Sequence, residues 1–100
     1  MIFYQLYKKR GVRETLHILY GVKNYRCSLS EFFENLEELG SNYNSFFRAR
    51  TDLLKMGLIH YRENRDKEKV IQLTSKGIKI VRILKEINDL MQIAHDVQVS

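Results

Sequence analysis

The sequence predicts a mainly α-helical protein with one small β-hairpin, an α+β fold in a single domain of 100 residues. Three observations predict it. Apolar residues recur at helical spacing along most of the chain. A single glycine, Gly40, separates two of these helical segments. The stretch GLIHYRENRDKEKVIQLTSKG, residues 57–77, has apolar ends and a densely charged centre, which is typical of two short strands joined by an exposed turn.

The first helix is expected between Gly11 and Gly21. Gly21 can adopt the left-handed conformation that ends many helices. The helical stripe consists of Val12, Thr15, Leu16, Leu19 and Tyr20. Residues 25–27 are expected to form a short extended segment. The preceding residues 1–7, MIFYQLY, fit a strand or a helix, because both periods bring their apolar residues together.

A second, acidic helix follows and ends at Gly40. Ser28 with Glu31 three residues later fits a capping box, and Ser30 is the alternative cap. The apolar stripe consists of Leu29, Phe32, Phe33, Leu36 and Leu39. The other faces carry Glu31, Glu34, Glu37 and Glu38. We expect these glutamates to form a solvated surface that phosphate groups would repel.

The third helix spans residues 42–56 and opens at Ser41 or Asn42, which are both good N-caps. Its buried face, at steps of three and four, consists of Phe46, Ala49 and Leu53, flanked by Phe47, Arg50 and Leu54. Because only Gly40 separates the periodic parts of the second and third helices, we expect a tight helix-turn-helix.

The hairpin, residues 58–74, is expected to turn around residues 64–67. Thr74 or Ser75 then caps a last helix over residues 75–97. From Ser75 to about Asp96, at ~1.5 Å per residue, this helix runs ~33 Å, more than a compact domain of this size needs. Its heptad-like seam consists of Ile80, Ile83, Leu84, Ile87, Leu90, Met91 and Ala94. An isologous homodimer is the simplest way to cover that seam.

The order of these elements is that of a winged helix-turn-helix with a long C-terminal helix. Two stretches, SNYNSFFRARTDLLKMGLI (41–59) and LTSKG (73–77), carry a resemblance to a known family. Through them the chain closely resembles archaeal and bacterial winged-helix transcriptional regulators of the multiple-antibiotic-resistance regulator (MarR) type. The resemblance implies that residues 11–74 form the winged-helix core and that residues 75–97 form a dimerisation helix.

The resemblance also implies a docking mode on double-stranded DNA. The third helix (42–56) would enter the major groove, and the wing (58–74) would lie on the backbone or in the minor groove. Arg48 suits a guanine and Asn44 an adenine. The expected base-edge contacts are Asn44, Ser45, Arg48 and Thr51, and the expected phosphate contacts are Tyr43, Lys55, Arg62, Arg65, Lys67 and Lys69. Ordinary solvation is the alternative for both sets, and in the wing the alternating Glu63, Asp66 and Glu68 partly cancel the cations.

Charge is segregated along the chain, whose formal net charge is +5. Residues 1–26 carry six Lys or Arg against one acid, and residues 28–42 carry four acids and no Lys or Arg. Residues 43–86 carry eleven Lys or Arg against five acids. This distribution predicts a basic face, which favours a polyanionic partner such as nucleic acid.

The sequence carries no sign of catalytic or metal chemistry. The single cysteine, Cys27, is expected to be a small buried hydrophobe. His17, His60 and His95 lack metal-ligand spacing, and no nucleophile elbow, phosphate loop or dinucleotide fingerprint is present. We therefore expect a protein that is not an enzyme and needs no cofactor. Its apolar runs fall short of the ~20 residues that span a bilayer, so we expect a cytoplasmic, nucleoid-associated location.

The leading hypothesis is a dimeric, sequence-specific transcriptional regulator that binds double-stranded DNA. Two alternatives stay open: an architectural or chromatin protein with little sequence preference, and a winged-helix module that binds other proteins. The modest net charge and the acidic second helix favour the regulator over the architectural protein. Similar regulators bind small molecules between the dimer helices and the winged domain, but no residue here points to an effector.

Overall fold

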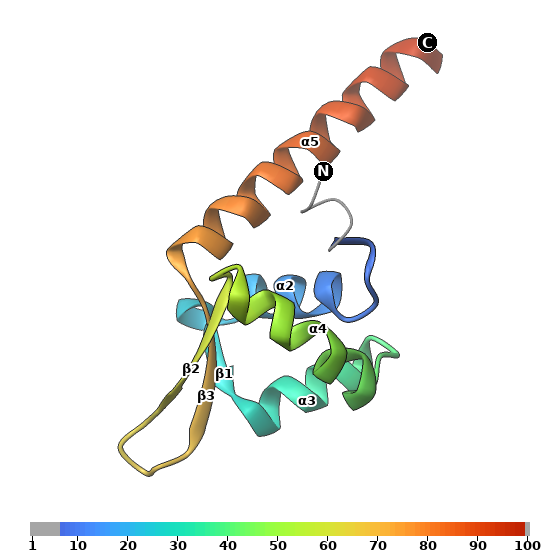
Figure 1. Cartoon of the computed structure of the whole chain (residues 1–100). Coiled ribbons are helices and arrows are strands. Elements are labelled where there is room, and N and C mark those ends of the chain that lie inside the picture. Colours follow the sequence, from blue (N-terminus) through green and yellow to red (C-terminus); the bar gives the residue numbers. More distant parts are fainter. Residues whose placement is uncertain (1–6, 100) are drawn as a thin grey trace.

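A computed structural model describes the backbone of residues 7–99 and the side chains of residues 7–91. Of the ambiguous segment at residues 1–7, residues 1–6 lie outside this part. The described elements are α2 (Val12–Gly21), the 3₁₀ turn η1 (Lys23–Tyr25), β1 (Arg26–Ser28), α3 (Leu29–Glu38), α4 (Tyr43–Lys55), β2 (Ile59–Glu63), β3 (Lys69–Leu73) and α5 (Ser75–Val99). Figure 1 shows α2, α3 and α4 gathered beside the sheet, while α5 extends away from them. The predicted mainly helical α+β fold with one hairpin is confirmed.

The sheet contains one pairing that we did not predict. Besides the hairpin of β2 and β3, β1 pairs antiparallel with β3, so the strand order is β1-β3-β2. Cys27 lies opposite Ile71 on one side of β3, and Ile59 lies opposite Leu73 on the other. The sheet therefore ties the segment before α3 to the wing.

Side-chain caps fix where α3 and α4 begin. Ser28, not Ser30, caps α3, because its Oγ accepts a hydrogen bond from the N–H of Glu31 at 3.1 Å. Asn42 caps α4, and its Oδ1 accepts from the N–H of Ser45 at 3.0 Å. The caps thus fix the first residue of each helix, and a connection of four residues joins α3 to α4.

The core lies between the three short helices and the sheet. Its largest fully buried side chains are Leu16, Leu19, Phe32, Leu36, Phe46, Leu53, Leu58, Ile59, Ile71 and Leu73. The rings of Phe32 and Phe46 pack with their centroids 4.9 Å apart, which joins α3 to α4. The prediction that Leu39 belongs to the buried stripe is wrong. Leu39 is 57% exposed, because α3 ends at Glu38 and Leu39 already lies in the turn that follows.

The end of α4 and the start of α5 are hydrogen-bonded to each other across the base of the hairpin. The N–H of Thr74 donates to the carbonyl of Leu58 at 3.0 Å, and the Thr74 hydroxyl donates to the carbonyl of Gly57 at 2.5 Å. Nζ of Lys76 donates to the carbonyl of Met56 at 2.8 Å. These bonds satisfy carbonyl groups just beyond α4 that the helix itself leaves unpaired.

The backbone of Gly77 completes this junction. Its N–H donates to the Thr74 hydroxyl at 3.0 Å, so Thr74, not Ser75, caps α5. A Cβ atom at Gly77 would collide with the carbonyl oxygen of Leu58 and would lie 2.8 Å from a methyl group of Leu73. Only glycine lets α5 approach the base of β2 and β3 this closely.

Replacing this glycine by alanine tests the junction. Gly77→Ala should lower the free energy of unfolding by about 1–3 kcal/mol, the usual cost of forcing an atom into an occupied site. This loss should outweigh the gain of up to ~1 kcal/mol in helix propensity. The free energy of unfolding of each variant is measured by denaturant titration, with circular dichroism as the signal. Gly21→Ala is the matched control, because nothing lies within 4 Å of the Cβ that it would add. Equal stability of the two variants would contradict the close packing.

The Cys27 thiol in β1 should be unreactive while the protein is folded. Burial, and to a smaller extent the charge of Glu31, raises its pKa from 9.0 to about 11. Because the thiolate is the reactive form, its fraction at pH 8 falls about 100-fold. We expect slow reaction with a disulfide reagent in buffer and fast reaction in denaturant at the same pH. Similar rates in both conditions would show that Cys27 is accessible.

Candidate nucleic-acid interface

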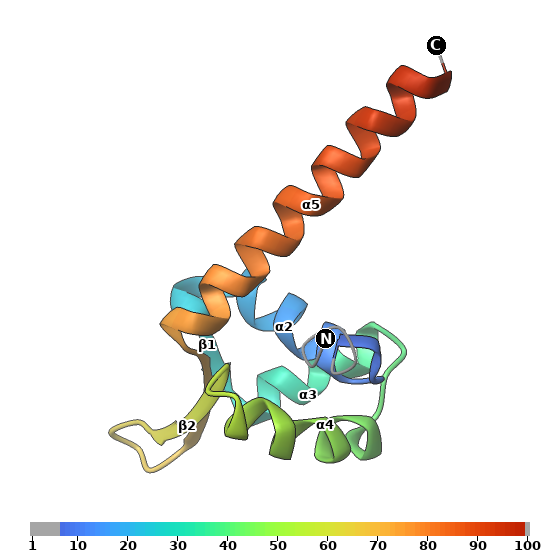
Figure 2. The same ribbon diagram turned by 45° about the horizontal axis from the view of Figure 1, so that its top comes forward.

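One surface of the molecule combines the outer face of α4 with the wing. Figure 2 shows α4 and the β2–β3 hairpin beside each other on the side away from the C-terminal end of α5. The inner side of α4 is covered by the rest of the core through Phe46, Ala49 and Leu53, as the sequence predicted. The opposite side of α4 is largely exposed, and it divides lengthwise into a polar half and an aromatic half.

The polar half carries four of the predicted contact residues. Asn44, Arg48, Thr51 and Lys55 are all exposed and follow one another at steps of four, three and four. Ser45 is different, since it is only 8% exposed. Its backbone carbonyl lies against Gly11, where an added Cβ would come within 2.5 Å of that oxygen. The side chain of Ser45 therefore does not belong to the outer row.

The aromatic half faces the wing. It consists of Tyr43, Phe47 and Leu54, each well exposed, with Arg50 between them. The Tyr43 ring stacks on the Phe47 ring with centroids 6.4 Å apart, and it packs against Phe33 of α3 at 4.5 Å. Tyr43, predicted as a phosphate contact, thus lies at the start of an apolar strip. Phe47 and Leu54, predicted to flank the buried face, are substantially exposed.

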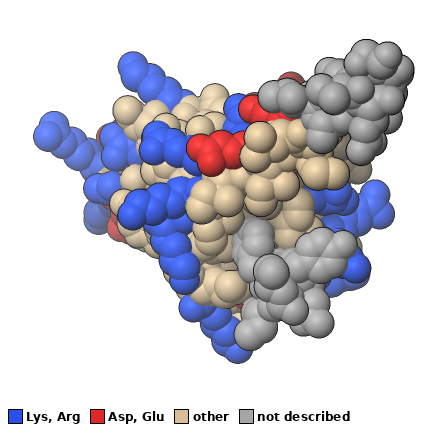
Figure 3. Space-filling view, turned by 90° about the horizontal axis from the view of Figure 1, so that it is seen from above, with Lys and Arg blue, Asp and Glu red and all other residues tan. Residues whose placement is uncertain are grey.

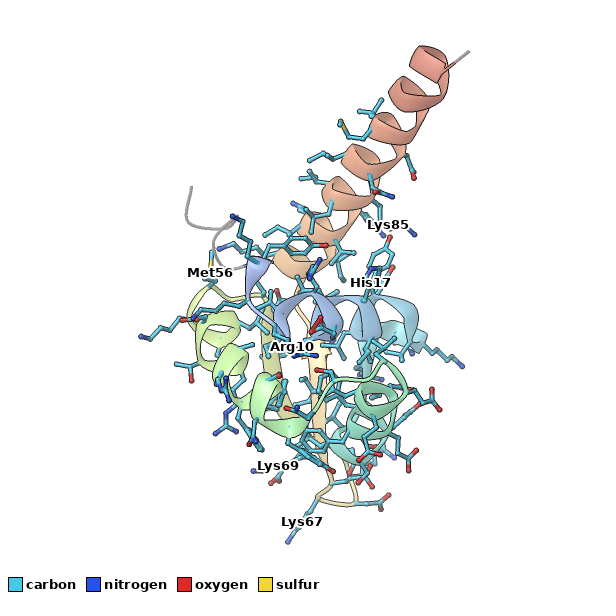
Figure 4. The ribbon with its side chains drawn as sticks, turned by 90° about the vertical axis from the view of Figure 1, so that its right-hand side faces the viewer. Arg10, His17, Met56, Lys67, Lys69 and Lys85 are labelled. Atoms are coloured by element: carbon cyan, nitrogen blue, oxygen red, sulfur yellow. The ribbon has the colours of Figure 1, made fainter. Side chains whose placement is uncertain are left out.

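Two cations from the segment before α2 join the polar half. Lys9 and Arg10 line a hollow of about 370 Å³ together with Asn42, Asn44, Ser45 and Arg48 at the beginning of α4. Figure 4 marks Arg10 near α2, close to the α4 side of the molecule. The hollow gathers three cationic side chains at a helix N-terminus, where the backbone dipole also favours an anion.

The carboxylate on α4 is neutralised by one of these cations. Nζ of Lys9 donates to Oδ2 of Asp52 at 2.6 Å. The hydrogen bond from Lys9 lowers the pKa of the Asp52 carboxyl, with Lys55 adding a smaller effect. The surface of α4 therefore presents no unpaired carboxylate. The sequence interpretation missed Lys9 and Arg10, although the run KKR at residues 8–10 was a visible signal.

The wing presents its predicted cations on an ordered turn. Oδ1 of Asn64 accepts hydrogen bonds from the N–H groups of Asp66 and Glu68, both at 2.9 Å. Arg62, Arg65, Lys67 and Lys69 are all exposed. Figure 4 shows Lys67 projecting from the tip of the wing and Lys69 higher up, on the strand. Within the described residues, the wing carboxylates form no ion pair with these cations.

A small cleft joins the wing to the aromatic half of α4. It has a volume of about 120 Å³ and is lined by Leu29, Phe33, Phe46, Phe47, Arg50, Tyr61 and Lys69. The guanidinium of Arg50 lies 4.7 Å from the centre of the Phe47 ring. Burial raises the pKa of the Tyr61 hydroxyl, and the nearby Arg50 acts in the opposite direction. Arg50 and Lys69 thus place positive charge beside the aromatic strip.

Some residues of the predicted seam on α5 contact the rest of the domain, and the others are exposed. Ile80 packs against the core, and Leu84 lines a hollow of about 270 Å³ between α2 and α5. The exposed members are Ile83 (54%), Ile87 (53%), Leu90 (64%) and Met91 (66%). Ala94 lies outside the residues whose side chains are described. Seen from the α5 end, Lys and Arg side chains project around much of the outline of the described part, while uncharged residues and a few acidic side chains lie nearer its middle (Figure 3).

Residues that could hold a metal ion do not gather in the described part of the chain. No three His, Cys, Asp or Glu side chains between residues 7 and 91 lie close enough together to share one. Nor is any helix described there long and apolar enough to cross a membrane.

Comparison with solved structures identifies the fold. No protein-family model and no curated protein sequence matches the chain. The structure is similar to MepR, a transcription regulator of the Staphylococcus aureus multidrug efflux pump MepA, with a TM-score of 0.72 and 22% identity over 100% of this chain and 80% of that one. A MepR–DNA complex gives a TM-score of 0.69 and 21% identity over 97% and 77%. A PadR-family transcriptional regulator from Eggerthella lenta gives 0.60 and 12% over 99% and 92%. The chain therefore has the winged-helix fold.

Proposed function

We propose that the protein is a dimeric transcriptional regulator that binds double-stranded DNA sequence-specifically. The observation that carries the proposal is the polar half of α4, where Asn44, Arg48, Thr51 and Lys55 are exposed in one row beside an ion-paired Asp52. The likeness to MepR, which has been solved in a complex with DNA, supports it. A protein of this kind would act in the cytoplasm, in association with the nucleoid.

The dimensions of α4 suit the major groove. An α-helix with its side chains is about 10–12 Å across, and the major groove of B-DNA is about 12 Å wide. In that position Arg48 would donate two hydrogen bonds to a guanine, and Asn44 would pair with an adenine. Thr51 would face a neighbouring base edge. Ser45 is left out of this set, because it is only 8% exposed.

Cations on both sides of α4 would hold the phosphate backbone. Lys9, Arg10 and Lys55 lie on one side, and the wing (58–74) supplies the other, on the backbone or in the minor groove. The wing set consists of Arg62, Arg65, Lys67 and Lys69. The hydroxyl of Tyr43 is a further phosphate donor at the start of α4. Each phosphate neutralised in this way releases counterions, so binding would weaken steeply as salt is added.

The exposed row on α5 would form the homodimer interface. Ile83, Ile87, Leu90 and Met91 are four large apolar side chains that nothing in the described chain covers. A second copy related by two-fold symmetry would bury them against the same row. Two copies of α4 would then read the two halves of a near-palindromic site, about one helical turn apart or a multiple of it.

Titration of duplex DNA at several salt concentrations tests the function. We expect tight binding to duplexes selected from a random library, and weaker binding to unselected duplex. In both cases the logarithm of affinity should fall linearly with the logarithm of salt concentration. Arg48→Ala should reduce the preference for the selected duplex by about 1–3 kcal/mol, whereas Arg10→Ala should weaken both and reduce the salt slope by about 1.

Lys85→Ala is the charge-matched control for these variants. Lys85 lies on the α5 side of the molecule, far from the wing tip (Figure 4), and its ammonium group is 5.3 Å from the centre of the Tyr20 ring. Its removal should leave affinity and salt slope nearly unchanged. Absence of salt-dependent binding would overturn the proposal. Equal affinity for all duplexes would instead indicate an architectural DNA-binding protein.

Charge placed on the α5 row should separate the dimer. Ile87→Glu combined with Leu90→Glu should give a monomer in sedimentation or light-scattering measurements, because carboxylates buried in an apolar interface lose their hydration. Circular dichroism should show an unchanged fold, since both side chains are exposed. Asn88→Glu, on the α2 side of the same helical turn, is the control and should remain dimeric. A monomeric unmodified protein would contradict the interface.

A further inference from the structure

The aromatic half of α4 exposes the ring of Phe47 to solvent. The proposed contacts of the polar row with DNA do not explain why a phenylalanine is exposed there. Phe47 is 44% exposed and lies one helical turn from both Tyr43 and Thr51. An exposed phenylalanine loses the free energy that burial would provide, about 25 cal/mol per Å² of apolar surface. An isolated exposed apolar side chain is ordinary. Here, however, the ring borders the row of Asn44, Arg48 and Thr51, which we propose to contact the bases, on the outer side of α4.

The Phe47 ring is held in place by its neighbours. Its centroid lies 5.8 Å from that of Phe46, 6.4 Å from that of Phe33 and 6.4 Å from that of Tyr43. The Arg50 guanidinium packs over it at 4.7 Å. Four contacts of this kind fix the orientation of the ring before anything binds. A fixed apolar surface loses little side-chain entropy on binding, which suits a ring that makes a specific contact.

The surroundings of the ring indicate what would cover it. Arg48 follows it along the helix, Arg50 lies over its ring, and Lys69 lines the same cleft. The carboxylate on α4, at Asp52, is paired with Lys9. A partner at this place is therefore polyanionic and carries a small apolar group. In the major groove of DNA that group is the 5-methyl group of thymine, the one apolar substituent on the base edges.

We propose that Phe47 is a specificity-determining residue that contacts the 5-methyl group of a thymine. The thymine would lie next to the base pairs read by Arg48 and Asn44, because Phe47 lies three residues after Asn44 and one before Arg48, which makes the three side chains neighbours on the outer side of α4. The inference rests on the proposed function and adds to it the chemical identity of one base. It makes the site selective by apolar contact as well as by hydrogen bonds.

Deoxyuridine substitution tests the contact directly. Deoxyuridine pairs as thymine does and lacks only the methyl group. In a duplex selected by the protein, each thymine is replaced singly and the dissociation constant is measured. We expect one position in each half-site to weaken binding about fourfold, the factor that corresponds to burial of one methyl group. All other thymines should tolerate the replacement.

The ratio of the two dissociation constants within one variant removes any effect of stability. For Phe47→Ala, the ratio between the deoxyuridine and thymine duplexes should fall from about four to about one. Phe47→Leu, which keeps an apolar side chain, should retain part of it. Leu54→Ala is the matched control on the same strip and should keep the full ratio.

The possible results separate a failure of the Phe47–thymine contact from a failure of DNA binding. Insensitivity of the unmodified protein to every deoxyuridine would overturn the inference and leave DNA binding intact. A ratio that persists in Phe47→Ala would also overturn it, because another side chain would then be contacting the methyl group. Failure to bind any duplex would instead contradict the proposed function itself.

Discussion

The carbonyl group of Leu58 is the point on which the arrangement of the molecule depends. It accepts the N–H of Thr74 and lies directly against Gly77. This one group connects the residue after α4, the base of the hairpin and the first turn of α5. The two stretches that it joins are MGLI (residues 56–59) and LTSKG (residues 73–77). They lie 17 residues apart in sequence between Gly57 and Thr74, and they form the two sides of a single hydrogen-bonded junction.

Local signals in the sequence were sufficient for most of the fold. The caps at Ser28 and Asn42, and the buried steps of α4, depend on contacts within a few residues, and these are readable from spacing. The pairing of β1 with β3 was not readable, because three residues are too few for a periodic pattern and their partner lies more than 40 residues away. Leu39 was placed wrongly because periodicity gives a direction around a helix, but not the residue at which that helix ends.

In the candidate site, too, contacts within one helix could be predicted from the sequence, whereas contacts between distant segments could not. The polar row of α4 could be predicted because all its members lie on one helix. The run KKR marked Lys9 and Arg10 as a basic cluster, but their position at the start of α4 could not be predicted, since only tertiary packing brings them there. On α5, periodicity grouped Ile80 with Ile87, but Ile80 packs against the core whereas Ile87 is 53% exposed. Which sector of a helix faces solvent is thus decided by its neighbours.

The antiparallel register of the hairpin has a consequence for how chains of this kind can vary in length. Ile59 lies opposite Leu73, and the pairing continues outward to Glu63 opposite Lys69. Residues inserted in equal numbers on both strands near the tip would lengthen the wing without moving Leu58 relative to Thr74. With the junction fixed, a single residue inserted in one strand would reverse the side to which the residues between the insertion and the tip of the wing point, or would force a bulge. Evolution can therefore extend the reach of the wing in paired steps while the junction at its base stays constant.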